Sequence, residues 1–577
     1  MSQLAVDPRS PLAGRTLSAT SGTRRTRRRA KGHGWTVTAL AIAALIALPL
    51  LFVMASLGFA KGDVWQHLIE TVLADYVANS LLLMGSVGVG VIVIGAGTAW
   101  AVTMYDFPGR KWLQWALLLP LAAPAYVLAY VYTDLLDYSG PVQSFLRELF
   151  GWHSRRDYWF PGIRSLPGAA VMLTLALYPY VYLMTRAALL QQCVCVLEVS
   201  RTLGCSPWGA FLRVGAPLAR PAIAGGAALA LMETLNDYGT VQYFGVPTFT
   251  TGIYRTWFGL GDPMAAAQLG SVLVLFVLAL LLLERWSRRA ASYQHATSRY
   301  REIRPIALRR GRRWLMTGLC LLPILLGFAV PAGSLLLRAI ASFDAWGDRR
   351  FLDSAWASLV LAGVTALVAV VVALLLAYGK RQRPSHTLDA ATNVATMGYA
   401  APGSVIAVGV LIPLTLVDNL IDGFAREQFG VPLGLVFTGG IAALVFAYLV
   451  RFLAVAHSAV DASLARIRPS FDGAASTLGH GSVARLFRIH VPMIASGILS
   501  AAILVFVDVM KELPATIIVR PFNFDTLAVQ TYRLASEERL DESAGYALAI
   551  ILVGLLPVIV LSRLMARSRP GDRMPEP

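Results

Sequence analysis

Twelve long apolar runs divide this chain and leave it few ways to fold. Each is close to the roughly 20 residues that an α-helix needs to cross a bilayer, and only 14% of the chain is charged. Because a bilayer offers no water to backbone N–H and C=O groups, such runs must form helices. The sequence therefore predicts an all-α polytopic membrane protein with about twelve transmembrane helices. The expected spans are residues 35–58, 77–103, 113–134, 165–190, 219–240, 264–284, 314–341, 355–379, 391–417, 434–457, 494–512 and 543–562.

The net charge of +17 is explained by where the Lys and Arg residues lie. They gather at the N-terminus and in the segments that fall on the same side of the membrane. By the positive-inside rule this side is the cytoplasm, so both termini are expected there. The charge needs no nucleic-acid partner. The run from Trp35 to Gly58 is too long for a signal peptide and is expected to stay as the first helix.

The chain also repeats itself. "AAPAYVLA" at 122–129 returns as "AAPGSVIA" at 400–407, and their prolines are expected to kink or break the third span of each half. Two halves of six spans cross in the same orientation, so a pathway is expected between them, as in a transporter or channel. The expected parts are a disordered basic cytoplasmic N-terminus (1–34), a first half (35–290), a basic cytoplasmic linker (291–312), a second half (313–565) and a cytoplasmic tail (566–577).

A polar insert follows the fourth span of each half, at 198–217 and at 473–492. Gly204 and Gly479 occupy the same place in the two inserts and suit a helix C-cap, where a positive φ favours Gly. Two inserts with the same spacing predict paired docking surfaces for a two-fold partner. Helices are expected over 188–203 and 463–478, then over 207–213 and 482–488, ending near Pro217 and Pro492.

The spacing resembles the EAA loop of ABC importer permeases, which reads E-A-A, three residues, Gly, nine residues, I-x-L-P. The first half keeps the Glu but lacks the alanines, and the second keeps the alanines but has Gly in place of Glu, with Asp472 one residue early. The two docking sites are therefore expected to be unequal. The matching residues are Glu198, Gly204 and Pro217 in the first half, and Gly473, Ala474, Ala475, Gly479 and Pro492 in the second.

The resemblance implies a type I, MetI-like permease of a bacterial inner membrane. Each EAA loop would dock on one of two cytoplasmic ATPase subunits, and a periplasmic or extracellular substrate-binding protein would deliver the solute. The chain has no G-x-x-x-x-G-K-[ST] phosphate loop. ATP and Mg²⁺ are thus expected on the partner, with no cofactor on this chain and no enzymatic activity of its own.

Residues 233–257 and 508–540 are similar to ferric-iron importer permeases, which are commonly fused two-half chains. Ferric iron is therefore the expected substrate. Thiamine or another small solute is the alternative within the same architecture. An ion-coupled secondary transporter is the alternative from a different class, and in it the EAA-spaced loops would have no role.

One pair of acids stands in the fifth span of each half. Glu233 and Asp237, and likewise Asp508 and Glu512, are four residues apart and are expected on one helix face. Each acid costs about 2.5–3.5 kcal/mol or more at a helix centre, and ferric iron prefers oxygen ligands. A translocation pathway lined by the four acids is therefore expected, with no metal site assigned. Alternatively, the acids are solvated at the external helix ends and Lys511 neutralises a neighbour.

Overall fold

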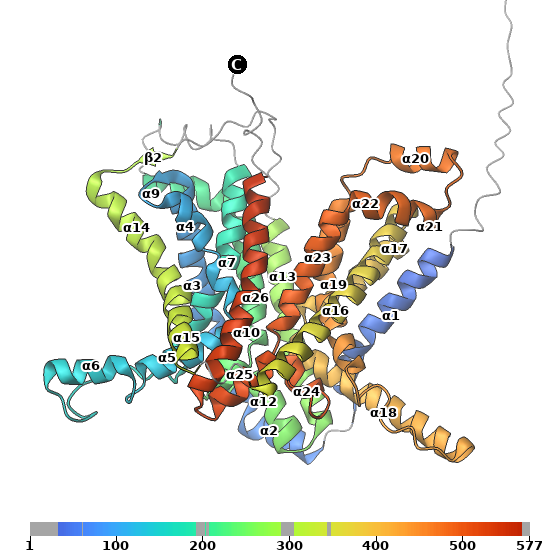
Figure 1. The fold of residues 1–577 in the computed structure, drawn as a ribbon, viewed down its shortest axis with the longest axis horizontal. Helices are drawn as coiled ribbons and strands as arrows, with labels where there is room; N and C mark the ends of the chain where they lie inside the picture. Colours follow the sequence, from blue (N-terminus) through green and yellow to red (C-terminus); the bar gives the residue numbers. More distant parts are fainter. Residues whose placement is uncertain are drawn as a thin grey trace, which may run out of the picture.

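Figure 1 shows a computed structural model, which describes residues 33–59, 62–191, 202, 207–289, 305–342 and 348–567. The elements of the first half are α1 (His33–Ser56), α2 (Asp63–Thr71), α3 (Leu73–Met104), β1 (Tyr105–Asp106), α4 (Arg110–Ala116), η1 (Leu119–Ala122), α5 (Ala125–Leu136), α6 (Pro141–Phe150), α7 (Leu166–Gln191), α9 (Pro207–Ala210), η2 (Phe211–Gly215), α10 (Ala216–Asn236), α11 (Gly239–Tyr243), α12 (Phe249–Tyr254), η3 (Arg255–Gly259) and α13 (Pro263–Arg289).

The elements of the second half are β2 (Ile306–Ala307), α14 (Arg310–Ile324), η4 (Leu325–Ala329), α15 (Val330–Ala341), α16 (Arg349–Gln382), α17 (His386–Ala395), η6 (Met397–Ala400), α18 (Gly403–Phe429), α19 (Ala442–Leu464), α20 (Ser470–Thr477), α21 (Ser482–Arg485), η7 (Leu486–His490), α22 (Val491–Met493), α23 (Ala495–Met510), α24 (Pro514–Val519), α25 (Leu527–Ser536) and α26 (Leu540–Arg567).

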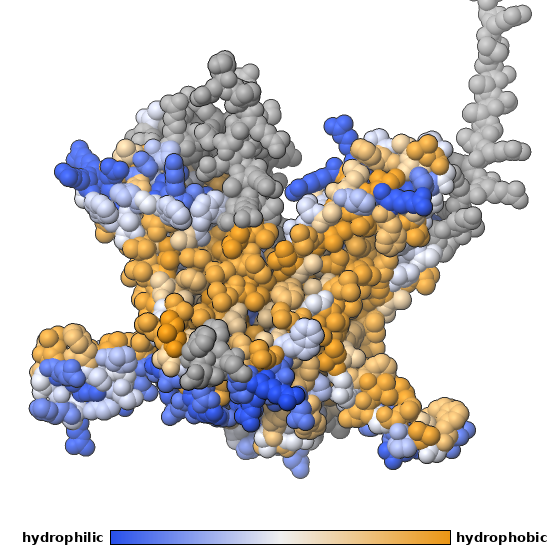
Figure 2. Space-filling model, viewed as in Figure 1, coloured by the Kyte–Doolittle hydropathy of each residue, from blue (hydrophilic) through white to orange (hydrophobic). Residues whose placement is uncertain are grey.

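The apolar runs form the expected spans. Within the described residues, ten helices are long and apolar enough to cross a membrane, and two bent helix pairs raise the number to twelve. Figure 2 shows an apolar belt across this face of the bundle, with polar residues gathered beyond both of its edges. The fold-class prediction, an all-α polytopic membrane protein, is confirmed.

Prolines interrupt the third span of each half. Pro124 is the N-cap of α5, and the helical segments before and after it meet at 92°. Pro402 is the N-cap of α18 and follows η6. Proline has no N–H to donate and keeps the preceding residue out of the helical region, and Ala123 and Ala401 have ψ values of 120° and 135°. The expected breaks are confirmed, and neither 113–134 nor 391–417 is one helix.

The two halves interlock through their first spans. α1 packs against α16, α17 and α18 of the second half, while α14 and α15 pack against α3, α4 and α5 of the first. In Figure 1, α1 accordingly stands among the yellow helices and α14 beside the blue ones. A short parallel pairing of β1 with β2 joins the end of α3 to the start of the second half. The first span of each half thus packs against the other half as well as against its own. The expected bounds of the halves stay a prediction.

Candidate translocation site and coupling loops

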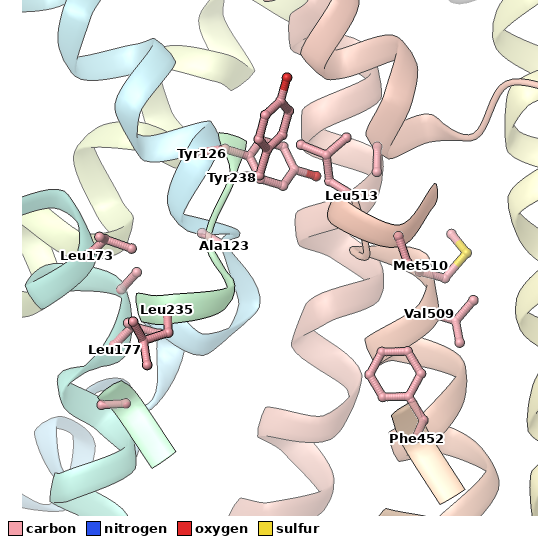
Figure 3. Close-up of a cluster of buried hydrophobic side chains, with 14 of the residues drawn as sticks. Ala123, Tyr126, Leu173, Leu177, Leu235, Tyr238, Phe452, Val509, Met510 and Leu513 are labelled. Atoms are coloured by element: carbon pink, nitrogen blue, oxygen red, sulfur yellow. The ribbon is translucent and has the colours of Figure 1, made fainter. Parts of the chain in front are cut away.

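A cavity of about 130 Å³ lies between the two halves. Its walls come from the start of α5, from α7 and from the end of α10 on one side, and from η6, α19 and the end of α23 on the other. Figure 3 shows apolar side chains on both sides of this region, with Leu177 of the first half and Phe452 of the second. A pathway between the halves is expected in this region.

Helices end beside the cavity at equivalent positions of the two halves. α10 ends at Asn236 and α23 at Met510, and the short helices α11 and α24 begin shortly after. The first N–H groups of a helix have no acceptor within it, and Asp237 and Glu512 accept hydrogen bonds from them. The donors are the backbone N–H groups of Thr240 (3.0 Å) and Val241 (3.2 Å) for Asp237, and of Ala515 (2.9 Å) and Thr516 (3.1 Å) for Glu512.

The prediction that each acid pair shares one helix face is therefore wrong. Glu233 and Asp508 lie in the last turns of α10 and α23, whereas Asp237 and Glu512 lie beyond the ends of these helices. The cause is local, because a carboxylate just before a new helix is stabilised by capping it. All four acids nevertheless line the same cavity. Their role in translocation stays a prediction.

Two cations stand among the acids, and both come from the second half. Arg451, from α19, is 6% exposed and donates to the amide oxygen of Asn236 at 2.7 Å. Its guanidinium also lies 3.9 Å from Glu233 and 3.8 Å from Glu512, so it connects the two halves. Lys511 contacts Asp508 at 3.0 Å.

Sequence reasoning missed Arg451 and Asn236. Arg451 lies within the expected span 434–457, and an arginine inside a span is costly enough to mark a functional position. Asn236 stands where the second half has Lys511, at the same offset of 275 that relates the acids. Lys511 was expected to neutralise a neighbour, and its contact with Asp508 agrees with that expectation.

The charges leave the cavity negative. Four carboxylates against two cations give a formal charge of −2 when all six groups are ionised. Within the described residues, no three His, Cys, Asp or Glu side chains are arranged to hold a metal ion. The site can therefore attract a cation without enclosing it in a complete set of ligands.

The second polar insert forms a helix, a turn and a second helix. Gly479 has a φ of +79°, as a C-cap after α20 requires. The expected single helix over 463–478 is wrong, because α19 ends at Leu464 and α20 begins only after Pro469. Pro469 is the N-cap of α20, and a proline disfavours the helical conformation at the residue before it.

Asp472 is the centre of a polar network under this turn. It accepts hydrogen bonds from Arg381 of α16 (3.0 Å) and contacts the His490 ring nitrogen at 2.7 Å. Burial alone would raise the pKa of Asp472, but the hydrogen bonds from Arg381 and His490 outweigh burial and hold this pKa below its usual value. Asp472 thus connects α20 to the end of α16 through Arg381 and to η7 through His490.

The other expected coupling residues fall into three groups. Gly473 and Ala474 are exposed on α20, whereas Ala475 is buried. Glu198 and Gly204 of the first insert lie outside the described residues. Pro217 lies in α10 and Pro492 in α22, and the surroundings of these two prolines differ between the halves.

The short helix of the first insert does not end near Pro217. α9 and η2 continue directly into α10, so Phe211–Asn236 is one span. Pro217 is the second residue of α10 and directly follows the π-helical turn η2, so it lies within this continuous span. In the second insert the helix ends at Met493, one residue after Pro492, and the next helix leaves at 79°. The expected end is therefore correct only in the second half.

Apolar side chains are exposed on the second insert. Leu478, Val483 and Phe487 are 77%, 58% and 64% exposed. They lie at the edge of the molecule where α20, α21 and α22 project (Figure 1). Exposed apolar groups beyond the lipid-facing belt are typical of a protein interface.

Known proteins are similar to this chain. Residues 91–293 match the family described as binding-protein-dependent transport system inner membrane component. The Fe(3+)-transport system permease protein FbpB 2 of Haemophilus influenzae is 25% identical over 528 residues, which cover 90% of this chain and 96% of that protein. The ferric transport system permease protein FbpB of Actinobacillus pleuropneumoniae is 25% identical over 87% of this chain and 72% of that protein.

Among solved structures, a bacterial alginate ABC transporter in complex with a periplasmic protein carrying an alginate pentasaccharide is 16% identical. The match has a TM-score of 0.35 and covers 44% of this chain and 96% of that chain. The family match lies mainly in the first half, and the ferric permease FbpB 2 matches across both halves. Residues 91–293 thus match the binding-protein-dependent transport system inner membrane components, and over most of its length the chain is similar to permease proteins of ferric transport systems.

Proposed function

We propose that this chain is the membrane pathway of an ATP-driven importer that moves ferric iron into the cytoplasm. The observation that carries the proposal is the cavity between the halves, with carboxylates at equivalent positions of the two fifth spans. Hard, highly charged cations favour such oxygen groups. The relatives named as ferric permeases favour the same substrate.

The acids have distinct tasks in this proposal. Glu233 and Asp508 lie on helix ends facing the cavity and are paired with Arg451 and Lys511. These cations reduce the cost of keeping carboxylates in a low-dielectric region when no substrate is present. An arriving cation adds its own charge, so the two side chains can leave their acids and return after it has passed. Asp237 and Glu512 mainly fix the helix ends that shape the cavity.

ATP hydrolysis is expected on two copies of a separate ATPase subunit. The exposed apolar residues of the second insert offer it a docking surface, and the Asp472 network makes that surface rigid. Rigidity matters because a coupling loop must pass a movement on to the spans without deforming. A substrate-binding protein would dock on the opposite side, and both termini would lie in the cytoplasm of a bacterial inner membrane.

Reconstitution with the ATPase subunits and the binding protein tests this function. Proteoliposomes are given binding protein loaded with ferric iron, with thiamine or with no ligand, and both ATP hydrolysis and uptake are measured. Ferric iron should stimulate hydrolysis and accumulate inside, and thiamine should do neither. Stimulation by thiamine alone would replace the iron assignment. Uptake that follows an ion gradient and needs no ATP would overturn the ATP-driven mechanism.

A further inference from the structure

Two helical hairpins project from the bundle on the side opposite the coupling loops. In Figure 1 they lie at opposite lower edges, one formed by α6 and the other by the far end of α18. The first hairpin is α6 with the return segment 151–164, and the second is residues 416–429 with the return segment 430–441. Both occupy the same place in their half, after the break at the third-span proline.

A short motif repeats in the two hairpins. "FLRELFG" at 145–151 returns as "FAREQFG" at 424–430, so the pattern F-x-R-E-x-F-G is shared. Its glycines end both helices in the left-handed conformation, Gly151 with a φ of +67° and Gly430 with a φ of +66°. Both halves have therefore kept the same helix end although most of their sequences differ.

Each hairpin exposes an apolar stripe. On α6 the residues Val142, Phe145 and Leu149 are 37%, 62% and 62% exposed, spaced as neighbours on one helix face. The far end of α18 carries a stripe of the same spacing, in which Val417, Leu420 and Phe424 are 40%, 73% and 61% exposed. Figure 2 shows apolar surface on the side of each hairpin nearest the apolar belt, with polar residues on the side away from it.

Aspartates of the hairpins accept hydrogen bonds from backbone N–H groups of the return segments. Asp422 accepts from the N–H groups of Leu433 and Gly434, both at 2.8 Å. Asp418 accepts from the N–H groups of Phe437 (2.9 Å) and Thr438 (2.8 Å) in the same way. In the first hairpin Asp157 accepts from the N–H groups of His153 and Ser154, both at 2.8 Å.

We propose that both hairpins lie in the membrane–water interface, with their apolar stripes against the lipid of the leaflet opposite the coupling loops. Three observations select lipid as the occupant. The stripes continue the lipid-facing belt, their polar sides face away from it, and aspartates within the hairpins satisfy backbone N–H groups of the return segments. An amphipathic helix of this kind buries its apolar face about 5–10 Å into the headgroup region. The two hairpins would hold the tilt of the bundle at opposite edges.

Fluorescence quenching in lipid tests the placement. The four native cysteines are replaced by alanine, and single cysteines at Phe145 or Phe424 are labelled with bimane in the full chain. Asn419, exposed on the other face of α18, and Arg156, exposed on the return segment of α6, are the matched control positions. Bilayers of brominated phosphatidylcholine should quench both Phe positions, while aqueous iodide should quench only the controls.

Two results would overturn the proposal. Quenching of the Phe positions by iodide and not by brominated lipid would place the stripes in water. Protection from both quenchers would mean that protein covers them, such as the binding protein or a second copy of the chain. Leu149 and Leu420 provide a second pair of labelling positions if either Phe variant fails to insert.

Discussion

Replacing Arg451 with methionine should destabilise the chain by about 3–5 kcal/mol, the usual cost of breaking a buried ion pair by removing one partner. Methionine keeps much of the length and the apolar stem of arginine but cannot neutralise a carboxylate. The substitution leaves Glu233 and Glu512 without a cation that now lies 3.9 and 3.8 Å away. It also removes the 2.7 Å hydrogen bond to Asn236.

The two carboxylates should not share this loss equally. At an effective dielectric constant of about 20, each ion pair at this distance amounts to roughly 4 kcal/mol before desolvation is subtracted. Glu512 keeps its hydrogen bonds at the start of α24 when Arg451 is removed. For Glu233, Arg451 is the ion-pair partner within 4.0 Å among the described residues. Adding Glu233→Gln to Arg451→Met should therefore recover more stability than adding Glu512→Gln.

Reversible unfolding by dodecyl sulfate in mixed micelles of fixed composition measures these differences. Lys380→Met is the matched control, because Lys380 also contacts an acid, Asp389, at 3.0 Å, but both side chains are more than 40% exposed. An exposed pair contributes about 0–1 kcal/mol. The reasoning is refuted if Arg451→Met costs no more than Lys380→Met, or if the Glu512→Gln double variant recovers more than the Glu233→Gln one.

Three further outcomes are expected. Glu233→Gln and Asp508→Asn should each slow ferric uptake about tenfold, equivalent to a loss of about 1.4 kcal/mol, at unchanged membrane abundance; fully additive losses in the double variant would contradict a shared ion. Gly479→Val should lower the stability of the loop by more than the roughly 1–2 kcal/mol that a left-handed conformation costs a residue with a side chain, and it should abolish substrate-stimulated ATPase activity. Gly481→Val is the control, because Gly481 is extended and has open space around it, and this variant should keep the activity. Asp472→Asn should lower hydrogen-exchange protection of α20, and the difference should shrink in acid, because a depressed pKa gives stability that is lost as pH falls through it.

The spans could be predicted from the sequence because their cause is local. Each apolar run satisfies its own backbone inside the membrane only as a helix. A proline disfavours a helix interior, although Pro49 and Pro179 lie inside continuous helices. The breaks at Pro124 and Pro402 were predicted because these two prolines stand in the repeated segments 122–129 and 400–407. The positive φ of Gly479 could also be predicted from the sequence, because the conformation of a turn depends on a few neighbouring residues.

The parts that sequence reasoning missed depend on contacts between distant segments. The spacing of four residues between Glu233 and Asp237 does not predict that α10 ends at Asn236. The helix ends there because Asp237 accepts hydrogen bonds from the first N–H groups of the next helix, α11. Arg451 is 218 positions from Glu233 along the chain, and no periodicity connects them. The packing of α1 against the second half could likewise not be predicted from the sequence repeat. A repeat shows which segments are duplicated but not which helices pack against one another.

The fusion of two halves into one chain explains why the cavity can be asymmetric. In a symmetric pair of identical subunits, Arg451 and Lys511 would each occur twice, and four cations would neutralise the four carboxylates. Here Asn236 occupies the place equivalent to Lys511, and α19 alone supplies the arginine. With all six groups ionised, the cavity therefore retains a formal charge of −2 and attracts a cation. Each of its helix-end acids, Glu233 and Asp508, still has a partner. Asn236→Lys would add a third cation and reduce this formal charge from −2 to −1, and it would remove the amide oxygen that accepts from Arg451. The substitution should therefore slow uptake of ferric iron even where the chain folds and docks its ATPase.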